Sequence, residues 1–269
     1  MTHIPSFVDA SRAELSSIRA IFFDIDDTIT SHGKLTSESY QALWNLKSCG
    51  YFLVPITGRP AAWCDHIVRF WPVDAIIGEN GAFVFFMANG KRSRIDYNDA
   101  GQEVISQRLN SLRKEIENKF PEAVCASDQR YREYDLAIDI CEDVPAWSMD
   151  RIVELKSFVE QQGFKAKLSS IHLNIWHGEH EKAKGIELWL NAGMPGVGGR
   201  RLQQEEMIFI GDSPNDAPLF AYFKNSVAVA NIEKYIPDLP ALPSWITTKE
   251  SGEGFCQFAG KMTKIKKEK

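Results

Sequence analysis

The stretch AIFFDIDDT, residues 20–28, joins an uninterrupted apolar run to three closely spaced aspartates. Apolarity at every position, rather than at every second one, is typical of a strand covered on both faces, as in a parallel sheet. Similar apolar runs occur at residues 52–56, 75–77, 207–210 and 227–230. We therefore expect a sheet of buried parallel strands.

Helical patterns separate these runs. Apolar residues recur at helical spacing in residues 40–46, 63–70 and 186–190. Pro60 suits the first turn of one helix, and Gly193 suits the end of another. Alternation of strands and helices predicts the α/β class, with a doubly wound parallel sheet.

The middle of the chain has another pattern. Apolar and polar side chains alternate in residues 136–141 and 171–176, which fits an antiparallel sheet with one face exposed to solvent. Amphipathic helical patterns at residues 104–120 and 149–162 accompany these strands. This part of the chain is expected to be an α+β insert.

The change of pattern predicts two domains. A core domain would consist of residues 1–85 and 181–269, and the insert would occupy residues 86–180. A chain of 269 residues, 44% of them hydrophobic, is long enough to bury a core in both.

Composition limits the cellular context. The five cysteines are widely spaced and include no C-x-x-C pair, as in a reduced cytoplasmic protein. Residues 1–17 mix charged and apolar side chains, so no signal peptide is expected, and no apolar run reaches membrane-spanning length. The net charge of −5 disfavours nucleic-acid binding. We expect a cytoplasmic protein with a small-molecule partner and leave its oligomeric state open.

Polar residues directly follow several of the apolar runs. In an open parallel sheet the ligand crevice lies outside the carboxyl ends of the strands, so these residues are candidates for a site. They are Asp24, Asp26, Thr57, Gly58, Arg59, Asp212 and Asn215, and Lys184 opens the helix that follows the insert.

A cluster of carboxylates at one sheet edge needs a counter-charge, because its members repel one another. A hard cation with oxygen ligands meets this need. Asp24 and Asp212 are expected to supply carboxylate ligands, and Asp26 a backbone carbonyl. A lysine would offset the charge of a bound phosphate.

This ordered set of motifs resembles that of the haloacid dehalogenase superfamily: a D-x-D-x-T loop, a threonine, a lysine and a G-D-x-x-N-D loop. The insert lies between Thr57 and Lys184, where the type II caps of that superfamily are found. Its α+β pattern is similar to the IIB cap of the Cof-type, sucrose-phosphate and mannosyl-3-phosphoglycerate phosphatases. The stretch IGENGA, residues 77–82, supports that subgroup. In two departures, Asp27 stands where many members have glycine, and Lys182 is an alternative to Lys184.

The resemblance and the chemistry of the residues imply a Mg²⁺-dependent phosphatase. Asp24 is expected to attack phosphorus and form an aspartyl-phosphate, while Asp26 acts as general acid and then general base. Phosphoryl oxygens would be bound by Thr57, the Gly58 amide and Lys184. Asp212 would hold the metal, oriented by Asn215 and Asp216.

The insert is expected to act as a cap that recognises a sugar or sugar-acid phosphate. The candidate substrate contacts are Arg59, Arg130, Arg132, Ser170, His172 and Asn174. Two alternatives remain open: a phosphotransferase of the same superfamily, and a non-enzymatic phosphate-binding module.

Overall fold

The structure is a computed structural model that describes residues 4–97, 101–169, 171–197 and 201–268. A parallel sheet with the strand order β12-β11-β10-β1-β2 lies at its centre. Its strands are β1 (Ala20–Phe23), β2 (Phe52–Pro55), β10 (Met207–Gly211), β11 (Ser226–Ala228) and β12 (Trp245–Ile246). Four of the five predicted apolar runs thus form this sheet, whereas residues 75–77 belong to the antiparallel sheet described below. The α/β class is confirmed.

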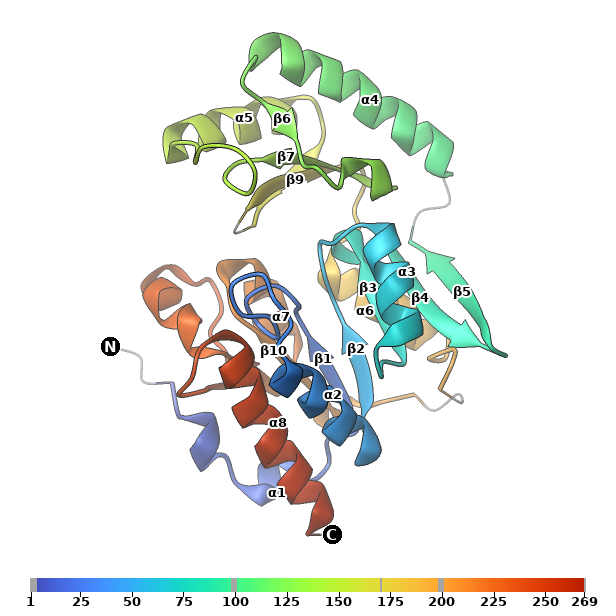
Figure 1. The fold of residues 1–269 in the computed structure, drawn as a ribbon, viewed down its shortest axis with the longest axis vertical. Helices are drawn as coiled ribbons and strands as arrows, with labels where there is room; N and C mark the ends of the chain where they lie inside the picture. Colours follow the sequence, from blue (N-terminus) through green and yellow to red (C-terminus); the bar gives the residue numbers. More distant parts are fainter. Residues whose placement is uncertain (1–3, 98–100, 170, 198–200, 269) are drawn as a thin grey trace.

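Helices cover both faces of this sheet, as Figure 1 shows. They are α1 (Arg12–Leu15), α2 (Ser37–Ser48), α3 (Ala61–Phe70), α6 (Lys182–Asn191), α7 (Ala217–Tyr222) and α8 (Ser251–Lys267). Alternate side chains of β1 enter two separate apolar cores: Ile21 and Phe23 pack in the core that includes α2, α3 and α8, and Phe22 packs in the core of α6 and α7. Continuous apolarity of the strand is therefore needed.

Local sequence signals set the helix boundaries. The side chain of Thr36 accepts a hydrogen bond from the Ser39 amide at 3.2 Å and caps α2. Shorter 3-10 helices connect the main elements: η1 (Phe7–Asp9), η2 (Glu79–Gly81), η3 (Gln129–Tyr131), η4 (Gln204–Glu206), η5 (Pro214–Asp216) and η6 (Ala230–Asp238).

A three-stranded antiparallel sheet extends the core beyond β2. It consists of β3 (Ala75–Gly78), β4 (Phe83–Ala88) and β5 (Lys91–Asp96), and a parallel bridge between Ile56 and Ile77 joins it to the end of β2. The division of the chain at residues 86 and 180 stays a proposal; residue 86 lies within β4.

The insert forms a second, antiparallel sheet with the strand order β6-β7-β9-β8. We refer to residues 102–176 as the cap. Its elements are α4 (Gln102–Lys119), β6 (Val124–Cys125), β7 (Asp135–Asp139), α5 (Met149–Gln161), β8 (Lys165–Leu168) and β9 (His172–Trp176). In Figure 1 this sheet lies between its two helices and the core.

The prediction that one face of the cap sheet is exposed to solvent is wrong. Every residue of β7 and β9 is buried. Leu136 and Leu173 pack in the apolar core of the cap, whereas the polar side chains of Asp139, His172 and Asn174 occupy the other face. That face is buried because it is turned toward the core domain. The alternation of apolar and polar side chains along β7 and β9 therefore separates the apolar core of the cap from a polar surface between cap and core.

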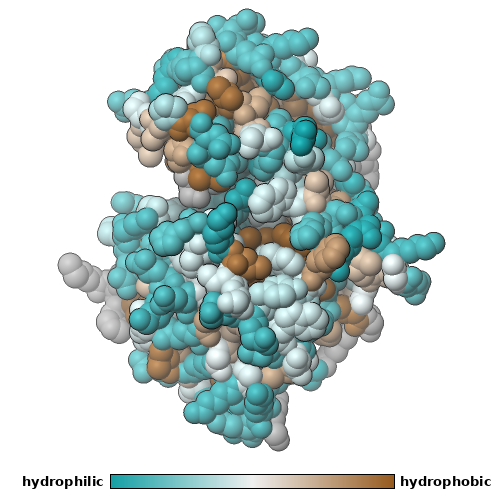
Figure 2. All heavy atoms as spheres, in the orientation of Figure 1, coloured by the Kyte–Doolittle hydropathy of each residue, from teal (hydrophilic) through white to brown (hydrophobic). Residues whose placement is uncertain are grey.

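The face drawn in Figure 2 is mainly hydrophilic, and it is hollowed at one side where the cap meets the core. No helix of the described residues is long and apolar enough to span a membrane. No disulfide joins the described cysteines, at positions 49, 64, 125, 141 and 256.

Candidate active site

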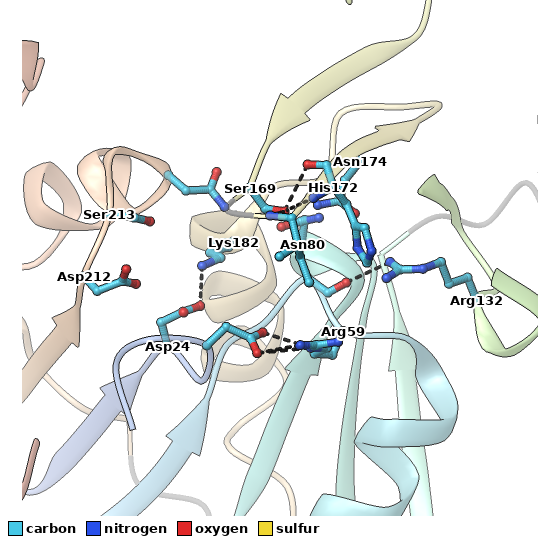
Figure 3. Close-up of a pocket in the computed structure, with 14 residues that line it drawn as sticks. Asp24, Arg59, Asn80, Arg132, Ser169, His172, Asn174, Lys182, Asp212 and Ser213 are labelled. Carbon is cyan, nitrogen blue, oxygen red and sulfur yellow. Dashed lines mark hydrogen bonds and ion pairs between the residues drawn. The ribbon is translucent and has the colours of Figure 1, made fainter. Parts of the chain in front are cut away.

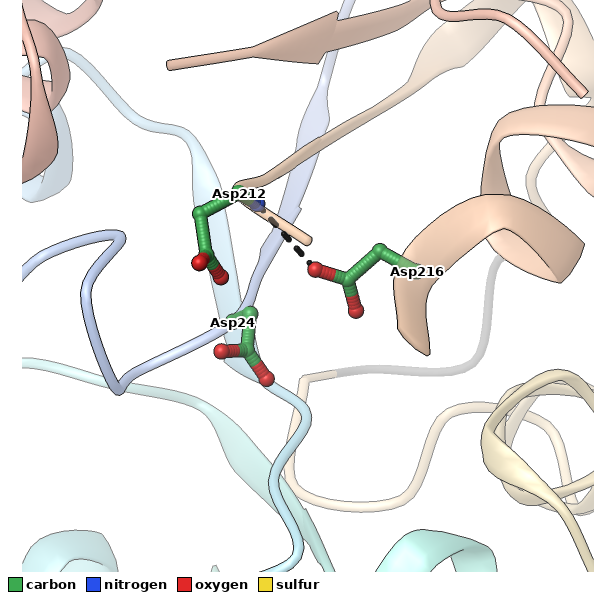
Figure 4. A group of neighbouring side chains, drawn as sticks. All are labelled: Asp24, Asp212 and Asp216. Carbon is green, nitrogen blue, oxygen red and sulfur yellow. Dashed lines mark hydrogen bonds between the residues drawn. The ribbon is translucent and has the colours of Figure 1, made fainter. Parts of the chain in front are cut away.

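Three buried aspartates meet at the carboxyl ends of two adjacent strands (Figure 4). Asp24 follows β1 and Asp212 follows β10, and the two lie side by side because Phe23 pairs with Ile210. Asp216, at the end of η5, accepts a hydrogen bond from the Asp212 amide at 3.1 Å. One carboxylate oxygen of each aspartate lies within 4.8 Å of the others.

Burial and mutual repulsion disfavour the ionised form of this cluster. Burial raises the pKa of Asp24 to about 7, although the charge of Lys182 opposes that shift. The pKa of Asp212 is raised well above its usual range by burial, and then by the charges of Asp216 and Asp24. One lysine cannot neutralise three carboxylates, so the cluster fits a hard divalent cation such as Mg²⁺.

The lysine of this cluster is Lys182, and the preference for Lys184 is wrong. Lys182 donates to Asp24 at 2.6 Å and to Asp216 at 2.8 Å, and its side chain is buried. Burial by itself lowers the pKa of Lys182, but the two carboxylates raise it above its ordinary value. Lys184 donates instead to the carbonyl oxygen of Glu179 at 2.8 Å, in an exposed position.

The sequence contains a pattern that distinguishes Lys182 from Lys184. Lys182 shares the buried face of α6 with Gly185, Ile186 and Trp189, at positions three, four and seven residues further on. Residues at this spacing lie on one side of a helix. Lys184 is two residues from Lys182, and that offset turns its side chain to another side of the helix.

The second aspartate of the D-x-D motif, Asp26, belongs to a different ion pair. Arg59 donates to both its carboxylate oxygens, with distances of 3.0 and 3.2 Å from Nε and 2.8 Å from a terminal nitrogen. The guanidinium also lies over the ring of Trp63, 4.7 Å from its centroid. A two-point contact of this kind fixes the orientation of the Asp26 carboxyl group.

Thr57 and Gly58 end the neighbouring strand β2. Gly58 lines the pocket described below, whereas Thr57 is buried and is not among the lining residues. The Thr57 hydroxyl accepts the amide of Arg59 at 3.0 Å, so its own hydrogen remains to be donated. The loop is therefore shaped by Thr57 and presents Gly58 and Arg59 to the pocket.

The cap contributes the opposite wall. His172 and Asn174 of β9 reach the pocket, and Nε2 of His172 lies 2.9 Å from a carboxylate oxygen of Glu142. Burial, and then the charge of Arg132, lowers the pKa of His172, so its imidazole is neutral at pH 7. Arg132 donates to the carbonyl oxygen of Gly58 at 2.9 Å and thereby ties the cap to the core.

Together these residues enclose a polar cavity of about 70 Å³ between core and cap (Figure 3). It brings together most of the predicted site residues, namely Asp24, Asp26, Gly58, Arg59, Arg132, His172, Asn174, Asp212 and Asn215. Arg130 is elsewhere, on Tyr131, and Ser170 lies outside the described residues.

The cavity is also lined by residues that the sequence reasoning missed: Asn80, Ser169, Ile171 and Ser213. Asn80 belongs to the IGENGA stretch and follows a buried strand. Its position after that strand is the sequence signal that could have identified it as a site residue. A further missed contact is Lys167 of β8, whose ammonium donates to the carbonyl oxygen of Asn215 at 2.8 Å.

Comparison with known proteins agrees with this geometry. A family model described as haloacid dehalogenase-like hydrolase matches residues 21–135 and 150–257. The chain is 24% identical over 251 residues to phosphoglycolate phosphatase 1 of Saccharolobus solfataricus, covering 92% of this chain and 96% of the relative. It is 27% identical over 246 residues to phosphoglycolate phosphatase of Methanothermobacter thermautotrophicus, covering 89% and 96%.

Among solved structures, the C-terminal domain of C. albicans trehalose-6-phosphate phosphatase superimposes with a TM-score of 0.71 at 13% identity. The match covers 97% of this chain and 98% of that domain. At this identity the likeness shows a shared fold, in which the cap is included because nearly the whole chain is covered.

Proposed function

This chain belongs to the haloacid dehalogenase-like hydrolase family, and we propose that it is a Mg²⁺-dependent phosphatase acting on a small sugar or sugar-acid phosphate through an aspartyl-phosphate. The predicted enzyme class, a phosphoric monoester hydrolase, is confirmed by the family and by the phosphatase names of the relatives. The observation that carries the proposal is the position of Asp24 in the pocket, 2.6 Å from Lys182 and among further carboxylates.

In the first step a carboxylate oxygen of Asp24 attacks phosphorus. The bond between phosphorus and the ester oxygen breaks, and Asp26 gives its proton to that departing oxygen, so a neutral alcohol leaves. Arg59 holds Asp26 at the pocket wall for this transfer. Asp24 remains ionised in spite of its burial because Lys182 offsets its charge, and a bound cation would add to this effect.

In the second step water attacks phosphorus of the aspartyl-phosphate. Asp26, now deprotonated, takes a proton from that water, and the bond between phosphorus and the Asp24 oxygen breaks. Inorganic phosphate leaves, and both aspartates return to their starting states. Lys182 and the Gly58 amide stabilise the charge on the phosphoryl oxygens during both steps. Thr57 acts indirectly, by shaping the loop that carries Gly58.

The metal would be held by the carboxylates of Asp24 and Asp212 and by the carbonyl of Asp26. Asp212 is oriented for this role by Thr28, which donates to one of its oxygens at 3.2 Å, and by Asn231, which donates to the other at 3.3 Å. When bound, Mg²⁺ supplies positive charge beside the phosphoryl oxygens.

A small substrate is supported by the size of the cavity. About 70 Å³ leaves room for roughly five water-sized groups. Phosphoglycolate, named for two relatives, is the phosphate ester of a two-carbon acid and is a small ester of the kind that such a cavity favours. His172 and Asn174 would contact the leaving group from the cap.

We further propose a cytoplasmic location, without a nucleic-acid or membrane partner. Five cysteines without a disulfide among the described residues suit a reducing compartment, and a net charge of −5 does not favour a polyanionic partner.

A phosphotransferase remains the alternative, since it would use the same nucleophile and pass the phosphoryl group to a sugar. The experiment that separates the two is product analysis with Mg²⁺ and glycerol 1-phosphate. Stoichiometric release of inorganic phosphate and glycerol supports the phosphatase. Phosphate release that requires an added sugar, with a new phosphate ester as product, would contradict it.

A further inference from the structure

The turn Glu79–Gly81 connects β3 to β4 and has no part in the mechanism above. Its residues have φ angles of 41°, 56° and 102° in chain order. Such left-handed backbone is unfavourable for residues with a side chain, and non-glycine examples concentrate at functional sites. At Gly81 a side chain is impossible, because a Cβ atom would lie 2.1 Å from the carbonyl oxygen of Glu181.

The buried carboxylate of Glu79 anchors this turn to two other segments. It accepts the amide of Ala61, at the start of α3, at 3.0 Å. It also accepts the amides of residues 133–135, which lead into β7 of the cap, at 2.5 to 3.2 Å. The turn is therefore positioned jointly by the core and the cap.

Asn80, the middle residue of the turn, points its amide into the pocket (Figure 3). The residue is only 3% exposed, and its Nδ2 has no hydrogen-bond partner among the described residues. Gly58 leaves space for it, because a Cβ atom there would lie 3.2 Å from Nδ2. On the cap side, Oδ1 of Asn174 is likewise buried without a partner in the described chain. Buried polar atoms of this kind are normally satisfied, so both indicate a ligand.

The two guanidinium groups near these amides already have carboxyl partners. Arg59 is paired with Asp26, and Arg132 is paired with Asp128 and Asp135 at 3.0 and 2.9 Å. Neither guanidinium is thus a spare cation for a substrate carboxylate. A neutral polar group suits this part of the pocket.

We propose that Asn80 is a specificity-determining residue, whose Nδ2 donates a hydrogen bond to a hydroxyl on the substrate's leaving group, and that this hydroxyl donates to Oδ1 of Asn174. A hydroxyl can accept from one amide and donate to the other, whereas a carboxylate has no hydrogen to donate. Glu79 is the positioning residue that holds the Asn80 turn. This inference rests on the proposed phosphatase function and narrows its substrates to hydroxylated phosphate esters.

The test compares glycerol 1-phosphate with propyl phosphate, which has the same number of carbons but no hydroxyl. Asn80→Gly removes the donor, adds no charge and tolerates the positive φ. Its matched control is Asn89→Gly, in the β4–β5 turn, where Asn89 also has a positive φ (52°) and also precedes a glycine.

The measured quantity is kcat/KM for glycerol 1-phosphate divided by kcat/KM for propyl phosphate. We expect this ratio to be about ten-fold lower in Asn80→Gly than in the wild type. The same ratio should be unchanged in Asn89→Gly. Equal loss for both esters, or no loss, would overturn the role of Asn80 while leaving the phosphatase intact. A wild-type protein that releases phosphate from neither ester would overturn the proposed function itself.

Glu79→Gln tests the positioning role. The variant keeps the size of the side chain but loses one of its two accepting oxygens. We expect the glycerol-to-propyl ratio to fall, with kcat/KM for propyl phosphate near its wild-type value. A parallel fall for both esters would show that Glu79 supports only the fold.

Discussion

The ammonium nitrogen of Lys182 lies 2.6 Å from a carboxylate oxygen of Asp24, although 158 residues separate the two in the chain. Both side chains are buried, and the same ammonium reaches Asp216 at 2.8 Å. The contact brings Lys182, from the part of the core that follows the cap, to Asp24, from the part that precedes it. It selects one lysine of the pair Lys182 and Lys184, and that selection can be tested.

Lys182→Met should lower kcat by on the order of a hundred-fold or more, because it removes a buried cation beside the transferring phosphoryl group. Lys184→Met is the matched control and should retain nearly full activity, since its ammonium lies outside the pocket. Both rates are measured with an aryl phosphate. Similar losses in the two variants would contradict the assignment.

The metal site predicts a response to divalent cations. Mg²⁺ should be required for turnover, and Ca²⁺ should inhibit because its larger and more variable coordination is unsuited to in-line transfer. Mg²⁺ at about 100 times its Kd should also stabilise the fold by about 2.7 kcal/mol. Calorimetry with and without chelator measures this, and Asp212→Asn should abolish the stabilisation. Full activity in excess chelator would refute the site.

The raised pKa of Asp24 predicts how stability depends on pH in the presence of chelator. Folding raises this pKa from 3.8 to about 7, so the folded state favours the protonated carboxyl. The contribution of Asp24 is fully present below its unfolded pKa and is lost as the pH rises toward 7. Asn resembles the protonated form and does not titrate. The melting temperature of the wild type, minus that of Asp24→Asn, should therefore decrease between pH 4 and pH 7. A difference that stays constant or increases would contradict the shift.

The cap sheet predicts a separation between recognition and chemistry. His172→Ala combined with Asn174→Ala should lower kcat/KM for the preferred sugar phosphate about ten-fold or more, because buried substrate hydroxyls lose their partners. A generic aryl phosphate should be nearly unaffected. Steady-state kinetics on both substrates measures this. Equal losses would assign the two residues to folding or to catalysis.

Much of the core was predictable because its signals are local. A strand buried on both faces must be apolar throughout, so the run at residues 20–23 predicted β1 at its observed bounds. Asp24 and Asp212 follow their strands directly, and adjacent parallel strands bring their ends together. Backbone geometry alone was enough for these residues.

The features that the sequence did not predict depend on how elements distant in the chain pack against one another. The alternation in β7 and β9 separates two faces but does not distinguish solvent from a domain interface, so the buried position of His172 was missed. The choice between Lys182 and Lys184 needed the rotation of α6 about its axis. Asn80 lies in a turn whose Glu79 binds the cap, a contact across 54 to 56 residues.

The central claim is that Asp24 carries the phosphoryl group, and trapping the phosphorylated enzyme tests it most directly. Asp26→Asn removes the base that activates water, so with an aryl phosphate, whose leaving group needs little protonation, the intermediate should accumulate. After rapid quenching, mass spectrometry of the peptides should find one phosphoryl group on Asp24, and none in Asp24→Asn combined with Asp26→Asn. A phosphoryl group on another residue, or turnover by Asp24→Asn above about a tenth of the wild-type rate, would contradict the account.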